Sequence, residues 1–232
     1  MIKQLLVVLA LAGLAWLLWP FLAEFRVSES NNALATEYIH GSINELNMPN
    51  VVTAVVVTYR GLDTLGEVTV LFLATAGVGF LLKRRELKGG KRRAGTEILR
   101  TGASFLAPLI VMFGVYIFTH GHLSPGGGFQ GGVVIASAML LLCLAYVDFD
   151  FSHRLLTWLE SLSGLAYAGL GLLGLVLLGA SSFLDPRFMP AGNWLRLFSA
   201  GAVPLIYSCV GLKVGAELST VLDSLRGPGG AA

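Results

Sequence analysis

The chain has 232 residues, of which 55% are hydrophobic and 13% are charged, and its mean hydropathy is +0.74. This composition is typical of an integral membrane protein and excludes a soluble globular domain. A formal net charge of only +2 provides no overall field that would attract nucleic acid. The charged residues are instead segregated along the chain, so their positions bear on membrane topology.

Six apolar stretches approach or reach the length of about 20 residues that a helix needs to cross a membrane. They comprise residues 5–21, 65–82, 99–119, 131–147, 162–180 and 197–215. The first contains tryptophans and a proline near its end rather than a small-residue cleavage site, so we expect a retained signal anchor. Pro108 and Pro204 fall inside later stretches and predict kinks. The predicted fold class is therefore an all-α integral membrane protein with six transmembrane helices.

The basic residues predict which side of the membrane each loop occupies. With six crossings, one side receives twelve of the sixteen Lys and Arg residues. These are Lys3, Lys83, Arg84, Arg85, Lys88, Lys91, Arg92, Arg93, Arg100, Arg154, Lys213 and Arg226. The positive-inside rule places that side, with both termini, in the cytoplasm. The apolar segment 50–59 has about half the length needed to span, and a crossing there would put Lys3 and the loop 83–100 on opposite sides. We therefore expect a short interfacial or re-entrant helix at 50–59.

The basic segment KRRELKGGKRR, residues 83–93, is the one candidate domain boundary. It predicts a two-helix unit over residues 1–95 and a four-helix unit over residues 96–232. A loop held between two membrane spans is poorly placed to bind duplex nucleic acid. We therefore interpret its charges as a topology signal, which is also compatible with contact with anionic lipid headgroups.

Polar residues at membrane depth are the first candidates for function, because removing charge from water is costly. Asp63 and Glu67 are four residues apart and share one face of a continuous helix, while Arg60 precedes Asp63 by three residues. An Arg60–Asp63 ion pair that anchors the second span is the simpler role for Asp63. Glu67 is expected to lie deeper, among apolar neighbours, where a proton or cation relay and a structural role are both open.

The second candidate stretch is HGHLSPGGGFQGG, residues 120–132. Gly126, Gly128 and Gly131 formally match the spacing of a dinucleotide-binding loop, but no strand precedes them and no ribose-binding acid follows, so we reject that function. Together with Pro125 and Gly127, these glycines predict a sharp turn and close helix packing.

Two histidines in the same stretch, His120 and His122, are able to titrate near neutral pH or to bind a metal. Without neighbouring carboxylates or thiols they are a weak metal signal, so no metal site is expected. Lys213 and Glu217 lie one turn apart near the expected cytoplasmic end of the last span, where snorkelling and a local ion pair explain them. Because no nucleophile triad, paired-cysteine motif or nucleotide loop is present, we expect neither enzymatic activity nor a cofactor.

Both candidate stretches resemble parts of one type of membrane complex. The segment HGHLSPGGGFQGGVV, residues 120–134, resembles the B subunit of multisubunit Mrp-type cation/proton antiporters, and the similarity extends over about residues 96–220. The segment NVVTAVVVTYRGLDTLGEVTVL, residues 50–71, resembles the C-terminal part of the antiporter A subunit, which is a separate E subunit in membrane-bound hydrogenases. The chain is thus similar to a fusion of E-like and B-like units. Leu62 departs from the aromatic residue that the family often has in this motif.

The resemblance implies a non-catalytic membrane subunit that helps to form the ion route of a complex exchanging Na+ for H+ in the cell membrane. Its partners would be the other subunits of that hetero-oligomer and the surrounding lipid. Glu67 matches the acidic residue of the family motif and is the first candidate for an ion relay, ahead of Asp63, Arg60, His120 and His122. The alternative is a structural or ion-translocating subunit in the membrane arm of a related redox complex, such as a membrane-bound hydrogenase.

Overall fold

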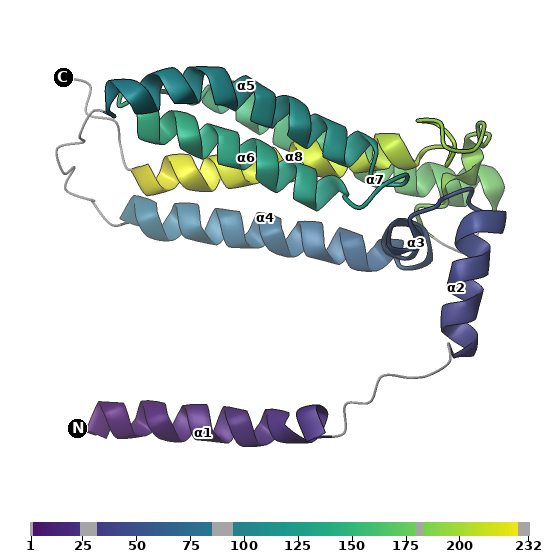
Figure 1. Ribbon diagram of the computed structural model, residues 1–232, viewed down its shortest axis with the longest axis horizontal. Helices are drawn as coiled ribbons and strands as arrows, with labels where there is room; N and C mark the ends of the chain where they lie inside the picture. The colour runs from purple at the N-terminus through teal and green to yellow at the C-terminus, as the bar shows by residue number, and fades with distance from the viewer. Residues whose placement is uncertain (1, 24–31, 85–94, 180–182, 227–232) are drawn as a thin grey trace. The chain divides into compact units, whose positions relative to one another are not determined.

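The computed structural model describes residues 2–23, 32–84, 95–179 and 183–226 (Figure 1). Over these ranges the chain is helical and has no β-strand. Its helices are α1 (Ile2–Ala23), α2 (Ala33–Asn44), α3 (Val51–Thr53), the π-helix η1 (Ala54–Tyr59), α4 (Gly61–Arg84), α5 (Glu97–Thr119), α6 (Gly128–Ala145), α7 (His153–Leu178), the 3-10 helix η2 (Pro186–Phe188) and α8 (Val203–Arg226). The chain divides into two compact units, residues 1–37 and 38–232.

Six of the described helices, namely α1, α4, α5, α6, α7 and α8, are long and apolar enough to cross a membrane. The all-α class and the six transmembrane helices are therefore confirmed. The basic segment 83–93, where we place the domain boundary, lies mostly outside the described residues. That boundary and the cytoplasmic location of both termini stay predictions.

The segment expected to form a short helix between the first two spans is helical from Val51 to Tyr59. Asn50 starts it, because its side-chain oxygen accepts hydrogen bonds from the backbone N–H groups of Val52 and Thr53. The helix then widens into the π-helix η1, which ends at Arg60. Its interfacial or re-entrant placement stays a prediction.

The bounds of the last two spans differ from the prediction. Helix α7 begins at His153 rather than at residue 162, because the Ser152 hydroxyl accepts a hydrogen bond from the Leu155 N–H and caps the helix there. Helix α8 begins at Val203 and continues to Arg226, so the predicted span 197–215 is shifted. Pro204 lies in the first turn of α8, where a missing N–H breaks no helical hydrogen bond, and the kink predicted there is wrong.

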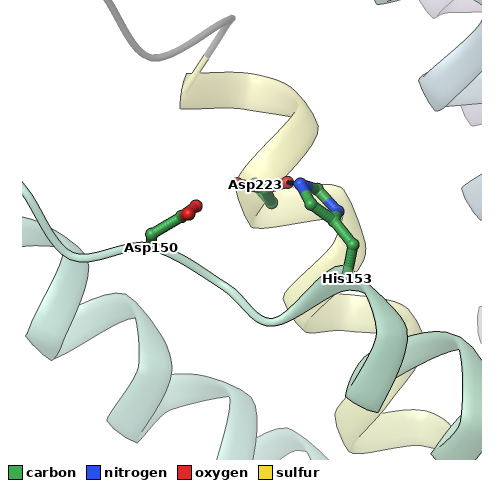
Figure 2. A group of neighbouring side chains, drawn as sticks. All are labelled: Asp150, His153 and Asp223. Atoms are coloured by element: carbon green, nitrogen blue, oxygen red, sulfur yellow. Dashed lines mark ion pairs between the residues drawn. The ribbon is translucent and has the colours of Figure 1, made fainter. Parts of the chain in front are cut away.

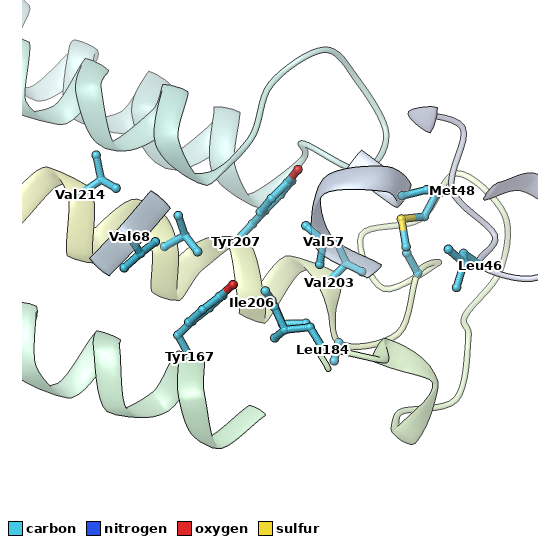
Figure 3. Close-up of a cluster of buried hydrophobic side chains, with 14 residues drawn as sticks. Leu46, Met48, Val57, Val68, Tyr167, Leu184, Val203, Ile206, Tyr207 and Val214 are labelled. Carbon is cyan, nitrogen blue, oxygen red and sulfur yellow. The ribbon is translucent and has the colours of Figure 1, made fainter. Parts of the chain in front are cut away.

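Helix α8 is the central helix of the second unit. It packs against α4, α5, α6 and α7, and more than half of its membrane-spanning residues are buried, against a third or less in each of those four. Figure 3 shows its buried face, where Ile206, Tyr207 and Val214 meet Val68 of α4 and Tyr167 of α7. The apolar core therefore follows α8.

Glycines allow α6 to approach helices on both of its sides. A Cβ atom at Gly131 would lie 2.6 Å from the carbonyl oxygen of Gly114 on α5, and one at Gly114 would lie 2.8 Å from that of Gly131. Towards α8, a Cβ at Gly132 would lie 2.7 Å from the carbonyl oxygen of Gly211. Backbones packed this closely leave no room for a side chain, which is how small residues join helices in membranes.

The segment preceding α8 is anchored by a buried ion pair. Asp185, whose side chain is 1% exposed, accepts hydrogen bonds from Arg187 Nε at 2.9 Å and Nη2 at 2.5 Å. Burial opposes ionisation of Asp185, but the hydrogen bonds and charge of Arg187 outweigh it and hold the pKa of this carboxyl below its ordinary value. The pair therefore stays charged at neutral pH and fixes the start of η2.

Candidate functional site

The first predicted site forms the corner between η1 and α4. Arg60 ends the π-helix and makes an ion pair with Asp63, and both side chains are more than half exposed. The Thr64 hydroxyl donates a hydrogen bond to the carbonyl of Val56 at 2.7 Å, which closes the corner on its buried side. An exposed pair of this kind contributes at most about 1 kcal/mol, so its main effect is to orient the two side chains.

Glu67 lies one turn beyond Asp63 on α4 and is exposed on this chain, which differs from the expectation that its own helix neighbours enclose it. The buried face of α4 at this level carries Thr64 and Val68 instead. The carboxylate of Glu67 is close enough to Tyr167 of α7 to act on its hydroxyl electrostatically. Within the unit 38–232, Glu67 is thus exposed on α4, beside the hydroxyl of Tyr167 on α7.

The two predicted histidines have different environments. His120 stacks on Tyr116, with 4.3 Å between ring centroids, and its Nδ1 lies 2.9 Å from Thr119 Oγ1. His122 is fully buried, and its Nε2 lies 3.4 Å from the carbonyl oxygen of Arg196. Burial lowers the pKa of His122, and the hydrogen bond to Arg196 offsets only part of that effect. His122 is therefore neutral at physiological pH.

The loop that carries these histidines is hydrogen-bonded to the start of α3. The Asn50 amide donates hydrogen bonds to the carbonyls of Gly121 at 2.7 Å and Ser124 at 3.0 Å. The Thr53 hydroxyl donates to the same Gly121 carbonyl at 2.6 Å and accepts from the Tyr207 hydroxyl at 3.2 Å. The two segments that carry the family resemblance are thus joined directly, through an asparagine that the sequence analysis did not identify.

The glycine motif turns the chain from α5 into α6. Gly126 has a φ of 156°, which other residues rarely adopt, and a Cβ at Gly128 would lie 2.6 Å from Val210 of α8. Pro125 is exposed at the tip, and Gly127 is buried against Tyr207. The motif thus forms the turn between α5 and α6 and lies in close contact with α8.

The local ion pair predicted between Lys213 and Glu217 of α8 is confirmed, but the snorkelling expected of it is wrong. Lys213 and Glu217, expected to snorkel at the cytoplasmic end, have side chains that are only 11% and 0% exposed. Lys213 Nζ lies 2.6 Å from Glu217 Oε1 and 5.2 Å from the ring centroid of Phe72 on α4. The error follows from ending the last span at residue 215, since α8 continues for eleven more residues to Arg226.

Figure 2 shows a third polar group, at the end of the bundle where α7 begins and α8 ends. It comprises Asp150, His153 and Asp223, whose nearest ligand-type atoms all lie within 4.8 Å of one another. His153 Nε2 lies 3.4 Å from Asp223 Oδ2, and the histidine side chain is 72% exposed. Exposed carboxylates of this kind are common on protein surfaces, and we assign no ion to them.

Comparison with protein families identifies the family to which this chain belongs. The model of the domain family related to the MnhB subunit of Na+/H+ antiporters matches residues 98–220, more than half of the chain. The chain belongs to the MnhB family. A second family model, that of MbhE, the E subunit of MBH, matches residues 2–89 of this MnhB-family chain. The resemblance inferred from residues 50–71 and 120–134 is therefore confirmed.

Individual relatives cover different parts of this MnhB-family chain. The B subunit of the Na+/H+ antiporter from Bacillus subtilis is 40% identical over 94 residues, which cover 40% of the chain and 62% of that relative. A chain of the membrane-bound sulfane sulfur reductase, an archaeal respiratory membrane complex, is 42% identical with a TM-score of 0.79, over 97% of this chain and 98% of that one. A chain of the Mrp complex from Dietzia sp. DQ12-45-1b has the same fold, with a TM-score of 0.74 and 24% identity, over 99% of this chain and 26% of that one. With its six apolar helices, the MnhB-family chain is a multi-pass protein of the cell membrane.

Proposed function

We propose that this chain is a membrane subunit of an Mrp-type cation/proton antiporter assembly, where it helps to form the route for Na+ and H+. Its MnhB family membership and its similarity to the antiporter protein of Bacillus subtilis support this function. We further propose that the chain is not itself an enzyme and that residues 1–95 and 96–232 are its E-like and B-like parts. The division is supported by the two family models, of which one ends at residue 89, within the basic segment, and the other begins at residue 98.

One observation carries the proposal for the ion route, namely the outward-facing carboxylate of Glu67. It lies six residues into α4, about 9 Å along the helix axis, in the half of the span nearer the Arg60–Asp63 pair. A carboxylate at this depth is costly against lipid, so it is expected to face another subunit or a water-filled path. Glu67 would then lie at the boundary between this chain and a neighbouring subunit, where an ion or proton can reach it from either subunit.

The test replaces Glu67 with Gln, which removes the ionisable group and keeps the side-chain volume. Membrane vesicles containing the native complex are assayed for Na+-dependent proton exchange, and the amount of assembled complex is measured in parallel. We expect exchange to fall by about tenfold or more with assembly unchanged, as is usual when an acid–base group is removed. Glu67→Asp should restore part of the activity.

Glu97→Gln provides the matched control, because Glu97 is an exposed carboxylate in the first turn of α5 and belongs to no candidate site. Normal exchange in an intact Glu67→Gln complex would disprove the relay role of Glu67.

A second candidate is a subunit of the membrane arm of a respiratory redox complex. The observation that favours it is the match to the sulfane sulfur reductase chain, which has nearly the same length and 42% identity throughout. The partners distinguish the two functions. Iron–sulfur subunits that co-purify in mild detergent, seen as visible absorption and by mass spectrometry, would support the redox complex, whereas a set of membrane subunits alone would support the antiporter.

A further inference from the structure

The Lys213–Glu217 pair lies in the middle of the most enclosed helix of the chain. Counted from Val203, the two residues are about 15 and 21 Å along the axis of α8, in a membrane core about 30 Å thick. Lys213 packs on Gly164 of α7 and beneath the ring of Phe72 on α4. A lysine and a glutamate are thus held at the junction of three helices, far from either end of the span.

The hydrogen bonds of this pair are incomplete. Glu217 Oε1 accepts from Lys213 Nζ, but Oε2 is fully buried and has no hydrogen-bond partner among the described residues. Buried carboxylates usually have both oxygens hydrogen-bonded, and structural ion pairs are stable only when they do. A carboxylate oxygen without a hydrogen-bond partner, beside an ammonium group, is therefore better suited to binding a proton or a cation than to stabilising the fold.

The surrounding charges are few and can be named. On α7, half-buried Glu160 lies one turn before Gly164 and interacts electrostatically with Glu217. The residue of α4 that contacts Lys213 is the uncharged Phe72. The charged residues of α4 lie in its first two turns or at its C-terminal end. Helix α6 has no charged residue, and those of α5 lie in its first turn. Two carboxylates and one ammonium group therefore share this site.

This arrangement selects a proton over a metal cation. A cation next to Oε2 would stand a few ångströms from the ammonium group of Lys213, and like charges repel strongly in a medium of low dielectric constant. A proton on Oε2 becomes part of a neutral carboxyl group and meets no such repulsion. While Glu217 is neutral, the ring of Phe72 provides a face that attracts the ammonium group.

We propose that Glu217, with Lys213 and Glu160, forms a proton-binding site inside this chain that is distinct from Glu67. A proton bound at Oε2 neutralises Glu217, and its release restores the ion pair with Lys213. Glu160 lies between this site and the end of the bundle where His153 Nε2 is 3.4 Å from Asp223 Oδ2, so it is placed to pass the proton to that end. The inference rests on the proposed ion-transport function, which it extends to a second protonatable residue on another helix.

The first test is infrared difference spectroscopy on the purified native complex, taken between high and low pH. We expect a protonated-carboxyl band that is lost in Glu217→Gln and retained in the Glu97→Gln control. Lys213→Met should move the band to higher pH, because removal of the ammonium group leaves the carboxylate without its counter-charge. A difference spectrum that is identical in wild type and Glu217→Gln would overturn the site.

The second test separates a proton site from a structural ion pair. The double variant Lys213→Met/Glu217→Gln removes both charges together, which a purely structural buried pair tolerates well. We expect the complex to assemble and proton transport to fall by about tenfold or more. Wild-type transport in this variant would reject the proposal.

If the double variant does not assemble, Glu217→Asp replaces it, since it keeps the charge and shortens the side chain by one methylene. A shifted carboxyl band would support the site, and an unchanged spectrum would overturn it. Because the infrared measurement does not depend on Glu67, normal exchange in Glu67→Gln would refute the first relay and leave this site standing.

Discussion

The contact between α5 and α6 permits a quantitative prediction for Gly131→Ala. The new Cβ would lie 2.6 Å from the Gly114 carbonyl oxygen, whereas ordinary van der Waals contact begins at 3.4 Å, so the two backbones must separate by about 0.8 Å. The new Cβ would also lie 3.0 Å from the side chain of Phe118, so α6 cannot relieve the clash by tilting towards Phe118. Overpacking of this kind costs about 1–3 kcal/mol, and the higher helix propensity of Ala returns about 1 kcal/mol.

The net cost of up to about 2 kcal/mol should lower the thermal midpoint of the detergent-solubilised chain by up to about 8 °C, at about 2–4 °C per kcal/mol for a chain of this size. The assay is thermal unfolding followed by size-exclusion chromatography of the surviving folded fraction. Gly102→Ala is the matched control, because a Cβ at this α5 glycine meets nothing within 4 Å and should stabilise the helix. Equal stability of the two variants would refute the close-packing argument.

Two further predictions concern the loop between α5 and α6. Asn50→Ala should destabilise the chain by about 2–4 kcal/mol, since it removes a helix cap and the donor to two carbonyls. Asn44→Ala, at the exposed end of α2, is the control and should have little effect on the thermal midpoint. Acidification should destabilise the chain through His122: its folded pKa lies below the unfolded value of 6.5, so the unfolded state takes up a proton first and stability falls as pH drops below about 6.5. Thermal midpoints measured between pH 8 and pH 5 should fall less in His122→Gln, and an equal fall would show that His122 is not responsible.

The number of spans was predictable because it depends on apolar length alone, which a sequence displays directly. The ends of α7 and α8 were not, since they are set by the Ser152 cap and by Pro204 in a first turn rather than by hydropathy. Lys213 and Glu217 were assigned to a helix end for the same reason: charged residues lower the local hydropathy and make a span look finished. Their burial follows from neighbours on α4 and α7, which no local pattern specifies.

Glu67 shows the opposite error, because it was expected to be enclosed and is exposed. Its apolar neighbours along α4 suggested enclosure, but a helix presents residues to all sides, and packing turned Thr64 and Val68 inward. The motif loop was recognised as a turn from its glycines, whereas its attachment through Asn50 joins residues about 70 positions apart, beyond any short-range signal.

The central position of α8 has a consequence for how this protein is made. Of the described helices, the one that contacts all four others of the bundle is also the last to leave the ribosome. Until it arrives, the glycine-lined face of α6 and the inner faces of α4 and α7 lack their packing partner, and the nascent chain depends on lipid or insertion factors to cover them. Helix α8 also carries Lys213 and Glu217, so its insertion brings two charges across the headgroups together, as a neutral pair one helical turn apart. We therefore expect the insertion of α8 to limit the biogenesis of this bundle.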